Sequence, residues 1–172
     1  IGLAVSTASA AIGKRVPHFR DGVGLIATQG KTNVLFGVKG LKLLELGFSP
    51  QETLDIMIGL DHNHQYRQVL ISNLSGEWAV STGELTEPWH GHLITPHYVV
   101  MGNTLPGRLV LEAMAEGFEK SSGELALRLM AGLKKGQEAG GDREGRRSAA
   151  MVVLSPHQFQ PWGPLVDLRV DF

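Results

Sequence analysis

Apolar positions along the chain recur at two spacings, and each spacing predicts one type of element. Runs in which apolar residues are continuous, or alternate with polar ones, are typical of strands. Runs with apolar residues three and four positions apart are typical of helices. The first spacing predicts strands over residues 2–7, 23–28, 66–73, 77–82, 98–102, 149–154 and 165–170.

The second spacing predicts four helices, arranged as two pairs. Ser49 and Glu52 form a capping box with Pro50 at the first helical position, and this combination is typical of a helix start. Gly47 follows the first predicted helix, and glycine is typical of the left-handed position that ends a helix. The predicted helices run from 38 to 46 before Gly47, from 50 to 60, from Pro106 to Phe118, and from Ser121 or Ser122 to Gly136.

The order of these elements predicts the fold class. Only Leu74, Ser75 and Gly76 separate two of the strands, so a hairpin with antiparallel pairing is expected. Helix pairs that alternate with groups of antiparallel strands indicate an α+β fold, with helices on both sides of the sheet, rather than a doubly wound parallel sheet. The length of 172 residues predicts a single domain over 1–172. Both ends interrupt a strand pattern, so a first strand and a C-terminal tail are expected outside this range.

Charge and composition exclude several classes of function. The 16 basic and 17 acidic residues nearly cancel, so neither a nucleic acid nor an anionic membrane surface is an expected partner. The chain has no cysteine, which excludes disulfides, thiolate metal sites and a cysteine nucleophile. No apolar run approaches membrane-spanning length, and we expect a cytoplasmic protein.

The sequence lacks clear motifs for three familiar kinds of site. The glycines of GVGLIA lead into a strand rather than a helix, so they do not form a dinucleotide fingerprint. A serine nucleophile in a GxSxG elbow is absent. Clustered histidines allow a metal-dependent hydrolase as an alternative, although their spacing matches no known metal motif and favours structural or solvated roles. They are His62 and His64 beside Asp61, and His90, His92 and His97.

Polar residues at the ends of predicted strands are the better candidates. Asp142, Arg146 and Ser148 precede the strand at 149–154, either as a ligand site or as a solvated turn in which Ser148 bonds the backbone. Asn103 follows another strand, where a side-chain amide could donate to an oxyanion or could form a turn. Gln29 and Asn33 flank the exit of a third strand and present the same two alternatives.

Short motifs in order along nearly the whole chain resemble one family. They are IGLAVST, GVGLIATQGKTN, GVKGLKLLELG, the pair Arg67 and Gln68, the pair Thr82 and Gly83, the pair Gly91 and His92, GNTL, GGDREGRRSAA and DLRVD. This set resembles an uncharacterised domain family of the N-terminal nucleophile (Ntn) hydrolase superfamily. The resemblance implies a four-layer αββα sandwich with mostly antiparallel sheets.

The resemblance also implies a mechanism. In this superfamily the first residue of the mature chain, a Thr, Ser or Cys, is the nucleophile, and its own α-amine serves as the base. An α-amine has a pKa of roughly 7.7–8.0, so it can accept a proton near neutral pH without a histidine partner. The nucleophile would lie roughly a dozen residues upstream of IGLAVST, beyond Ile1.

The resemblance also implies roles for individual residues of this chain. Asp142, Ser148 and Asn103 are the predicted catalytic group, with Asn103 as the oxyanion donor. Ser6, Gln29, Asn33 and Arg146 are the predicted substrate-binding group, with Arg146 able to hold a carboxylate. The expected activity is hydrolysis of a small-molecule amide without a cofactor.

One alternative function and one expectation about assembly also follow from the sequence. A non-catalytic binding or scaffold domain with the same fold is the alternative from a different class. The apolar positions of 34–46 suggest a helix face that could pair with a second copy, so a homo-oligomer is expected.

Overall fold

The computed structural model describes residues 1–155 and 163–171. All strand pairings within these residues are antiparallel. Four α-helices accompany the strands of the described chain, which therefore has a mixed α/β fold with antiparallel sheets, as the sequence predicts.

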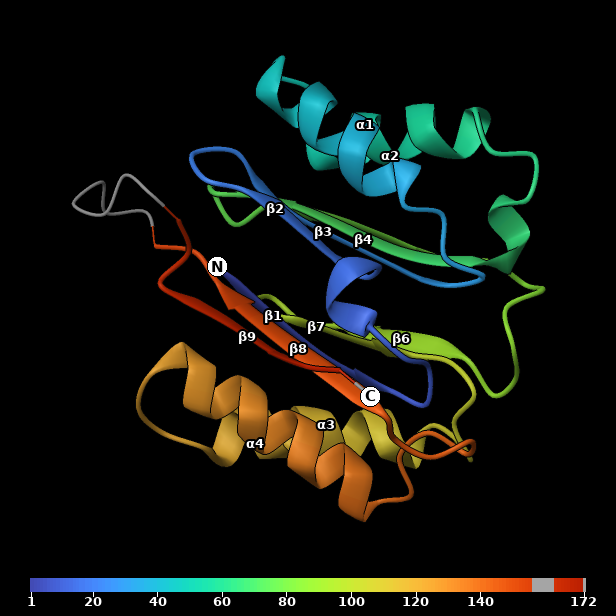
Figure 1. Ribbon diagram of the computed structural model, residues 1–172, viewed down its shortest axis with the longest axis vertical. Helices are drawn as coiled ribbons and strands as arrows, with labels where there is room; N and C mark the ends of the chain where they lie inside the picture. The colour runs from blue at the N-terminus through green and yellow to red at the C-terminus, as the bar shows by residue number, and fades with distance from the viewer. Residues whose placement is uncertain (156–162, 172) are drawn as a thin grey trace.

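One sheet has four strands in the order β2-β3-β4-β5. Helices α1 and α2 cover its outer face, as Figure 1 shows at the top of the molecule. The elements are β2 (Pro17–Arg20), β3 (Gly24–Gly30), α1 (Leu35–Glu45), α2 (Pro50–Gly59), β4 (Arg67–Asn73) and β5 (Trp78–Thr82), with short 3₁₀ turns at Ile12–Lys14 and His64–Tyr66.

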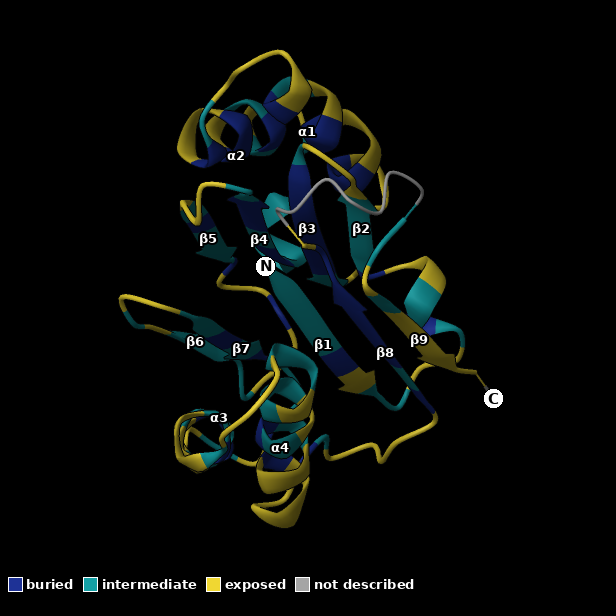
Figure 2. Cartoon of the chain, turned by 90° about the vertical axis from the view of Figure 1, so that its left-hand side faces the viewer, coloured by how far each residue is buried: buried dark blue, intermediate teal, exposed yellow. Residues whose placement is uncertain are grey.

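The remaining strands lie on the other side of this sheet, with α3 and α4 outside them (Figure 1). Three strands pair in the order β1-β8-β9, and β6 pairs with β7 as a separate hairpin. Figure 2 shows β7 and β1 as neighbours in this layer. The elements are β1 (Gly2–Thr7), β6 (Gly91–Ile94), β7 (Val99–Gly102), α3 (Leu109–Lys120), α4 (Leu125–Glu138), β8 (Ser148–Val153) and β9 (Val166–Val170).

Alternation along β4 separates two packing faces. Val69 and Ile71 belong to the hydrophobic cluster beneath α1 and α2. Leu70 points the other way, into a smaller cluster that joins Val5 of β1 to Ala27 of β3. Because side chains alternate between faces along a strand, Gln68 shares the inner face with Leu70, between the sheets.

The same rule fixes the two faces of β1. A side chain at Gly2 would meet Leu125 and Leu129 of α4, whereas Val5 lies in the inner cluster. Ser6 is therefore on the face turned toward the helices, and its side chain is exposed.

Several local predictions are confirmed. The Ser49 hydroxyl accepts from the backbone of Glu52, and the Glu52 carboxylate accepts from the backbone of Ser49, which completes the capping box. Strands β4 and β5 form the expected hairpin. The glycines of GVGLIA lead into β3, with no helix after them.

Other predictions need correction. β2 and β6 were missed, since each has only four residues and carries little periodic signal. Helix α1 begins three residues earlier than expected, at Leu35. Helix α4 continues past Gly136 to Glu138, because this buried glycine packs against Met114 of α3 instead of ending the helix.

Gly117 allows α3 and α4 to approach closely. An added Cβ there would lie 2.7 Å from the Ala131 carbonyl oxygen and 2.6 Å from Lys135 Cγ. We expect Gly117→Ala to lower the free energy of unfolding by about 1–3 kcal/mol in urea titrations. Gly59, in α2, has no heavy atom within 4 Å of the corresponding position. Gly59→Ala should raise stability by roughly 0.5–1 kcal/mol, and equal effects at both sites would contradict this packing account.

Candidate functional site

A buried amide connects the four-stranded sheet to the β6-β7 hairpin. Gln68 of β4 is 0% exposed. Its Nε2 lies 2.8 Å from the Gly91 carbonyl oxygen and 3.2 Å from that of Gly102, the two residues that pair at one end of the hairpin. Its Oε1 accepts from Gln29 Nε2 at 2.7 Å and from Asn103 Nδ2 at 3.3 Å. The side chain of Gln68 thus gathers two of the predicted site residues.

The network continues to a histidine. Gln68 Nε2 also lies 3.0 Å from Thr82 Oγ1, and Thr82 Oγ1 lies 2.9 Å from His92 Nδ1. His92 pairs with Met101, which packs against the inner cluster between the sheets. Directly opposed residues share a face, so His92 also points to the inner side.

Asn103 is joined to the loop before β8 through its neighbour. Thr104 Oγ1 donates to Asn103 Oδ1 at 3.2 Å, and the Thr104 carbonyl accepts from the backbone N–H of Arg143 at 2.9 Å. Thr104 has φ 58°, a left-handed conformation that is rare for a β-branched residue. Strained backbone of this kind clusters at functional sites, so the turn at Asn103 is a good candidate for one.

Asp142 and Ser148 tie the same loop to the end of β1. Asp142 Oδ2 accepts from the Ala8 N–H at 3.2 Å, and its Oδ1 accepts from the Glu144 N–H at 2.9 Å. Ser148 is buried; its hydroxyl accepts from Ile12 N–H at 3.1 Å and donates to the Ser9 carbonyl at 2.6 Å. Both side chains bond the backbone, the alternative that the sequence left open for Ser148. Their catalytic roles stay predictions.

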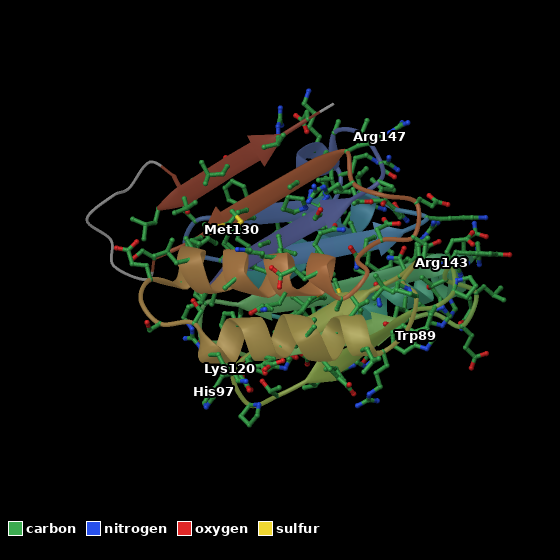
Figure 3. All side chains as sticks on the ribbon, turned by 90° about the horizontal axis from the view of Figure 1, so that it is seen from below. Trp89, His97, Lys120, Met130, Arg143 and Arg147 are labelled. Atoms are coloured by element: carbon green, nitrogen blue, oxygen red, sulfur yellow. The ribbon has the colours of Figure 1, made fainter. Side chains whose placement is uncertain are left out.

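The loop between Asp142 and Ser148 connects Thr104 to the Thr7 end of β1. The Thr7 carbonyl accepts from the Arg147 N–H at 2.8 Å, and Ile1 is at the opposite end, where its nitrogen bonds the Leu154 carbonyl. Six strand residues span about 20 Å, so the site lies one strand length from Ile1. Figure 3 shows Arg143, Arg147 and Trp89 at one end of the molecule, and His97 and Lys120 at the other.

Asn33 belongs to a separate cluster around Asp61. Its Nδ2 donates to Asp61 Oδ2 at 2.9 Å, and its Oδ1 accepts from the Leu35 N–H at the start of α1. Arg67 Nε donates to the same Asp61 oxygen at 3.0 Å, and its guanidinium also bonds the Lys31 carbonyl. Asn33 therefore uses both ends of its amide to hold the loop between β3 and α1.

The charge of Asp61 is stabilised by these partners. Burial raises the pKa of the Asp61 carboxyl, but hydrogen bonds from Arg67, Asn33 and Asn63 outweigh this effect, so the pKa lies below its usual range. A lowered pKa in the folded state means that the ionised form stabilises the fold. This contribution is fully present above the pKa of the unfolded chain and is lost as pH falls through the folded pKa.

Asp61→Asn should therefore cost more stability at pH 7 than at pH 3. Urea titrations of both proteins at the two pH values measure the difference in their free energies of unfolding. Asp55, an exposed carboxylate on α2, provides the matched Asp55→Asn control, for which the difference should change little. A gap between Asp61→Asn and the unmodified protein that is equal at both pH values would contradict the assignment.

Ser6 and Arg146, the two other predicted binding residues, belong neither to the Gln68 network nor to the Asp61 cluster. Ser6 faces the helix side of its strand. Arg146 is exposed in the loop between Asp142 and Ser148, next to Arg147. Arg146 can reach a ligand at this end of the molecule only from solvent, and its role also stays a prediction.

The described histidines do not form a cluster with acidic side chains that could bind a metal ion. Within residues 1–155 and 163–171, no three His, Asp or Glu side chains lie close enough to hold a metal ion. His64 bonds the Asp61 carbonyl and Gln65, while His97 is exposed. His90 Nδ1 is buried without a hydrogen-bond partner in this described part.

Gln68, Thr82 and His92 were not predicted as a connected site. The sequence places Gln68 and Thr82 in strands and His92 in a histidine-rich stretch. One usable signal was present: Gln68 occupies an inner position of a strand whose next inner residue is the apolar Leu70. A polar residue at such a position needs buried partners.

Comparison with known proteins assigns the family. These observations define a mixed α/β protein with antiparallel sheets and a buried polar network between them. The model of DUF1028, a family of unknown function, matches residues 1–172, and the chain belongs to that family.

A solved structure agrees over the whole chain. The crystal structure of protein SPO2555 from Silicibacter pomeroyi, matched to the same family, is similar with a TM-score of 0.88 and 32% sequence identity. The similarity covers 100% of this chain and 73% of that one. A search of curated proteins gave no match. No helix in the described residues is long and apolar enough to cross a membrane.

Proposed function

We propose that the protein is an Ntn-type amidohydrolase that cleaves a small amide with an N-terminal Thr or Ser located upstream of Ile1. The observation that carries this proposal is a continuous set of hydrogen bonds. Gln68 joins Gln29 to Asn103, and the loop of Asp142 joins the neighbouring Thr104 to Ala8 at the end of β1. The stacking of a helix pair, two layers of strands and a second helix pair supports the four-layer αββα sandwich that such enzymes share.

Two open strand edges could accommodate the upstream segment that this proposal requires. In the described residues β1 pairs only with β8, and β7 pairs only with β6. Met101 of β7 packs against the cluster that contains Val5 of β1, so the two strands are near neighbours. A preceding strand that folds back antiparallel along β1 would have its first residue beside Thr7. The nucleophile would then stand near Asn103 and Asp142.

Each group would have a defined task. The α-amine of the first residue takes the proton from its own hydroxyl, and the hydroxyl oxygen attacks the amide carbonyl carbon. An N–H of Asn103 stabilises the resulting oxyanion. The amine proton then passes to the leaving nitrogen, an acyl-enzyme forms, and water releases the acid product.

The remaining predicted residues position the substrate and the loop. Asp142 holds Ala8, the residue after Thr7, in place through its backbone bond. Arg146 is available to bind a substrate carboxylate, since a guanidinium matches its two oxygens. Gln29 lies beside Gln68 and donates to its Oε1. We further propose a homo-oligomer, for which the exposed Val34, Leu35 and Val38 of the α1 region give an apolar surface.

Intact-mass spectrometry of the chain with its preceding segment tests the function. A β-lactone that acylates hydroxyl nucleophiles should add one acyl group, located by peptide mapping on the first residue. Replacing that residue by alanine should abolish the adduct, and Asn103→Ala should slow its formation by roughly 10²–10³-fold. An adduct absent from the first residue would overturn the enzyme proposal and favour a binding or scaffold domain.

A further inference from the structure

The hydrogen bonds of Gln68 determine how its amide is oriented. One end of the amide faces two backbone carbonyls, those of Gly91 and Gly102. Carbonyl oxygens only accept, so this end must be the NH₂ group. The opposite end is then Oε1, which can only accept. Gln29 and Asn103 must therefore each turn an NH₂ group toward Gln68.

This orientation leaves a donor on Asn103. One N–H of its Nδ2 points to Gln68, and its Oδ1 accepts from the Thr104 hydroxyl. The second N–H of Asn103 has no partner in the described residues. The Asn103 amide could in principle adopt two orientations, and Gln68 selects the one that leaves an N–H donor available.

The same reasoning extends to His92. Gln68 Nε2 has no lone pair to accept from Thr82, so the Thr82 hydroxyl hydrogen cannot point to it. Within the described chain the other partner of Thr82 Oγ1 is His92 Nδ1, at 2.9 Å. A hydroxyl that donates to Nδ1 uses its hydrogen within this network, and the proton of neutral His92 is then on Nε2. No described residue bonds that Nε2.

We propose that Gln68 is the positioning residue of this site, and that it presents the free N–H groups of Asn103 and His92 to a ligand that offers only oxygen acceptors, a carbonyl or a carboxylate. The chemical meaning of this inference rests on the proposed function, because an amide substrate and its acid product both offer such oxygens. A ligand whose polar group only donates hydrogen bonds would find no acceptor on either free group.

The tautomer of His92 tests the positioning directly. In protein with ¹⁵N-labelled histidine, long-range ¹H–¹⁵N spectra at neutral pH should show His92 with its proton on Nε2. Thr82→Val removes the hydroxyl at nearly constant volume and should produce a mixture of tautomers. Thr82→Ser keeps the hydroxyl and should retain the single Nε2–H form. A proton on Nδ1 in the unmodified protein, or an unchanged spectrum in Thr82→Val, would overturn the inference.

A titration with small ions tests the ligand class. Acetate should shift the Asn103 side-chain NH₂ and His92 resonances in a saturable way, whereas methylammonium at the same ionic strength should not. Saturable shifts with methylammonium, or none with acetate, would overturn the assignment to oxygen acceptors. Neither measurement needs turnover, so a failure here is distinct from the absence of an acyl adduct on the first residue.

Discussion

Gln68→Leu is expected to lower the free energy of unfolding by about 2–5 kcal/mol, because each buried polar group left without a partner costs about 1–3 kcal/mol. The substitution leaves the Gly91 and Gly102 carbonyls and the Asn103 amide without their shared partner. Leucine has nearly the same volume, so the loss reflects hydrogen bonding more than a cavity. Urea titration at neutral pH measures it.

The matched control replaces an exposed glutamine. Gln51 is on the surface of α2, where its amide donates to Asp55. Gln51→Leu should change the free energy of unfolding by less than about 0.5 kcal/mol. Equal effects of Gln51→Leu and Gln68→Leu would mean that the buried network contributes nothing to stability.

Phe36→Ala should reduce the free energy of unfolding by about 3–5 kcal/mol, the usual cost of removing a large buried aromatic side chain. Phe36 is 0% exposed and lies in the cluster that packs α1 and α2 onto the four-stranded sheet. The cavity would open within this cluster, which also contains Leu41 and Leu44 of α1.

Val38, two positions further along α1, provides the comparison. It is 61% exposed. Val38→Ala should therefore change the free energy of unfolding by less than about 0.5 kcal/mol. Thermal or urea unfolding of both variants distinguishes burial from helix propensity, and a large effect at Val38 would indicate that a second molecule covers this face.

Local signals in the sequence predicted most elements of the fold. The capping box at Ser49 and Glu52 depends on residues three positions apart, so it can be recognised without tertiary information. Gly136 misled the prediction of the end of α4 because a glycine that ends a helix and one that admits a neighbouring helix look the same in sequence. Only the contact with Met114 separates the two roles.

The candidate site was predictable in part for a similar reason. Asn103 and Gln29 stand at strand exits, a position that sequence periodicity can identify. Their common partner could not be identified this way, since Gln68 and Asn103 are 35 positions apart and meet only when two sheets stack. Ser6 was expected to border the pocket, but the side to which it points depends on the register of β1 with β8.

The hydrogen bonds of Gln68 also affect the local unfolding of the β6-β7 hairpin. The β6-β7 hairpin shares no strand pairing with either larger sheet in the described chain, so it would be expected to detach first. Detachment must break the bonds to Gly91 and Gly102 at the same time. Protection against hydrogen exchange in this hairpin should consequently track that of β4, and the two should lose protection as one cooperative unit.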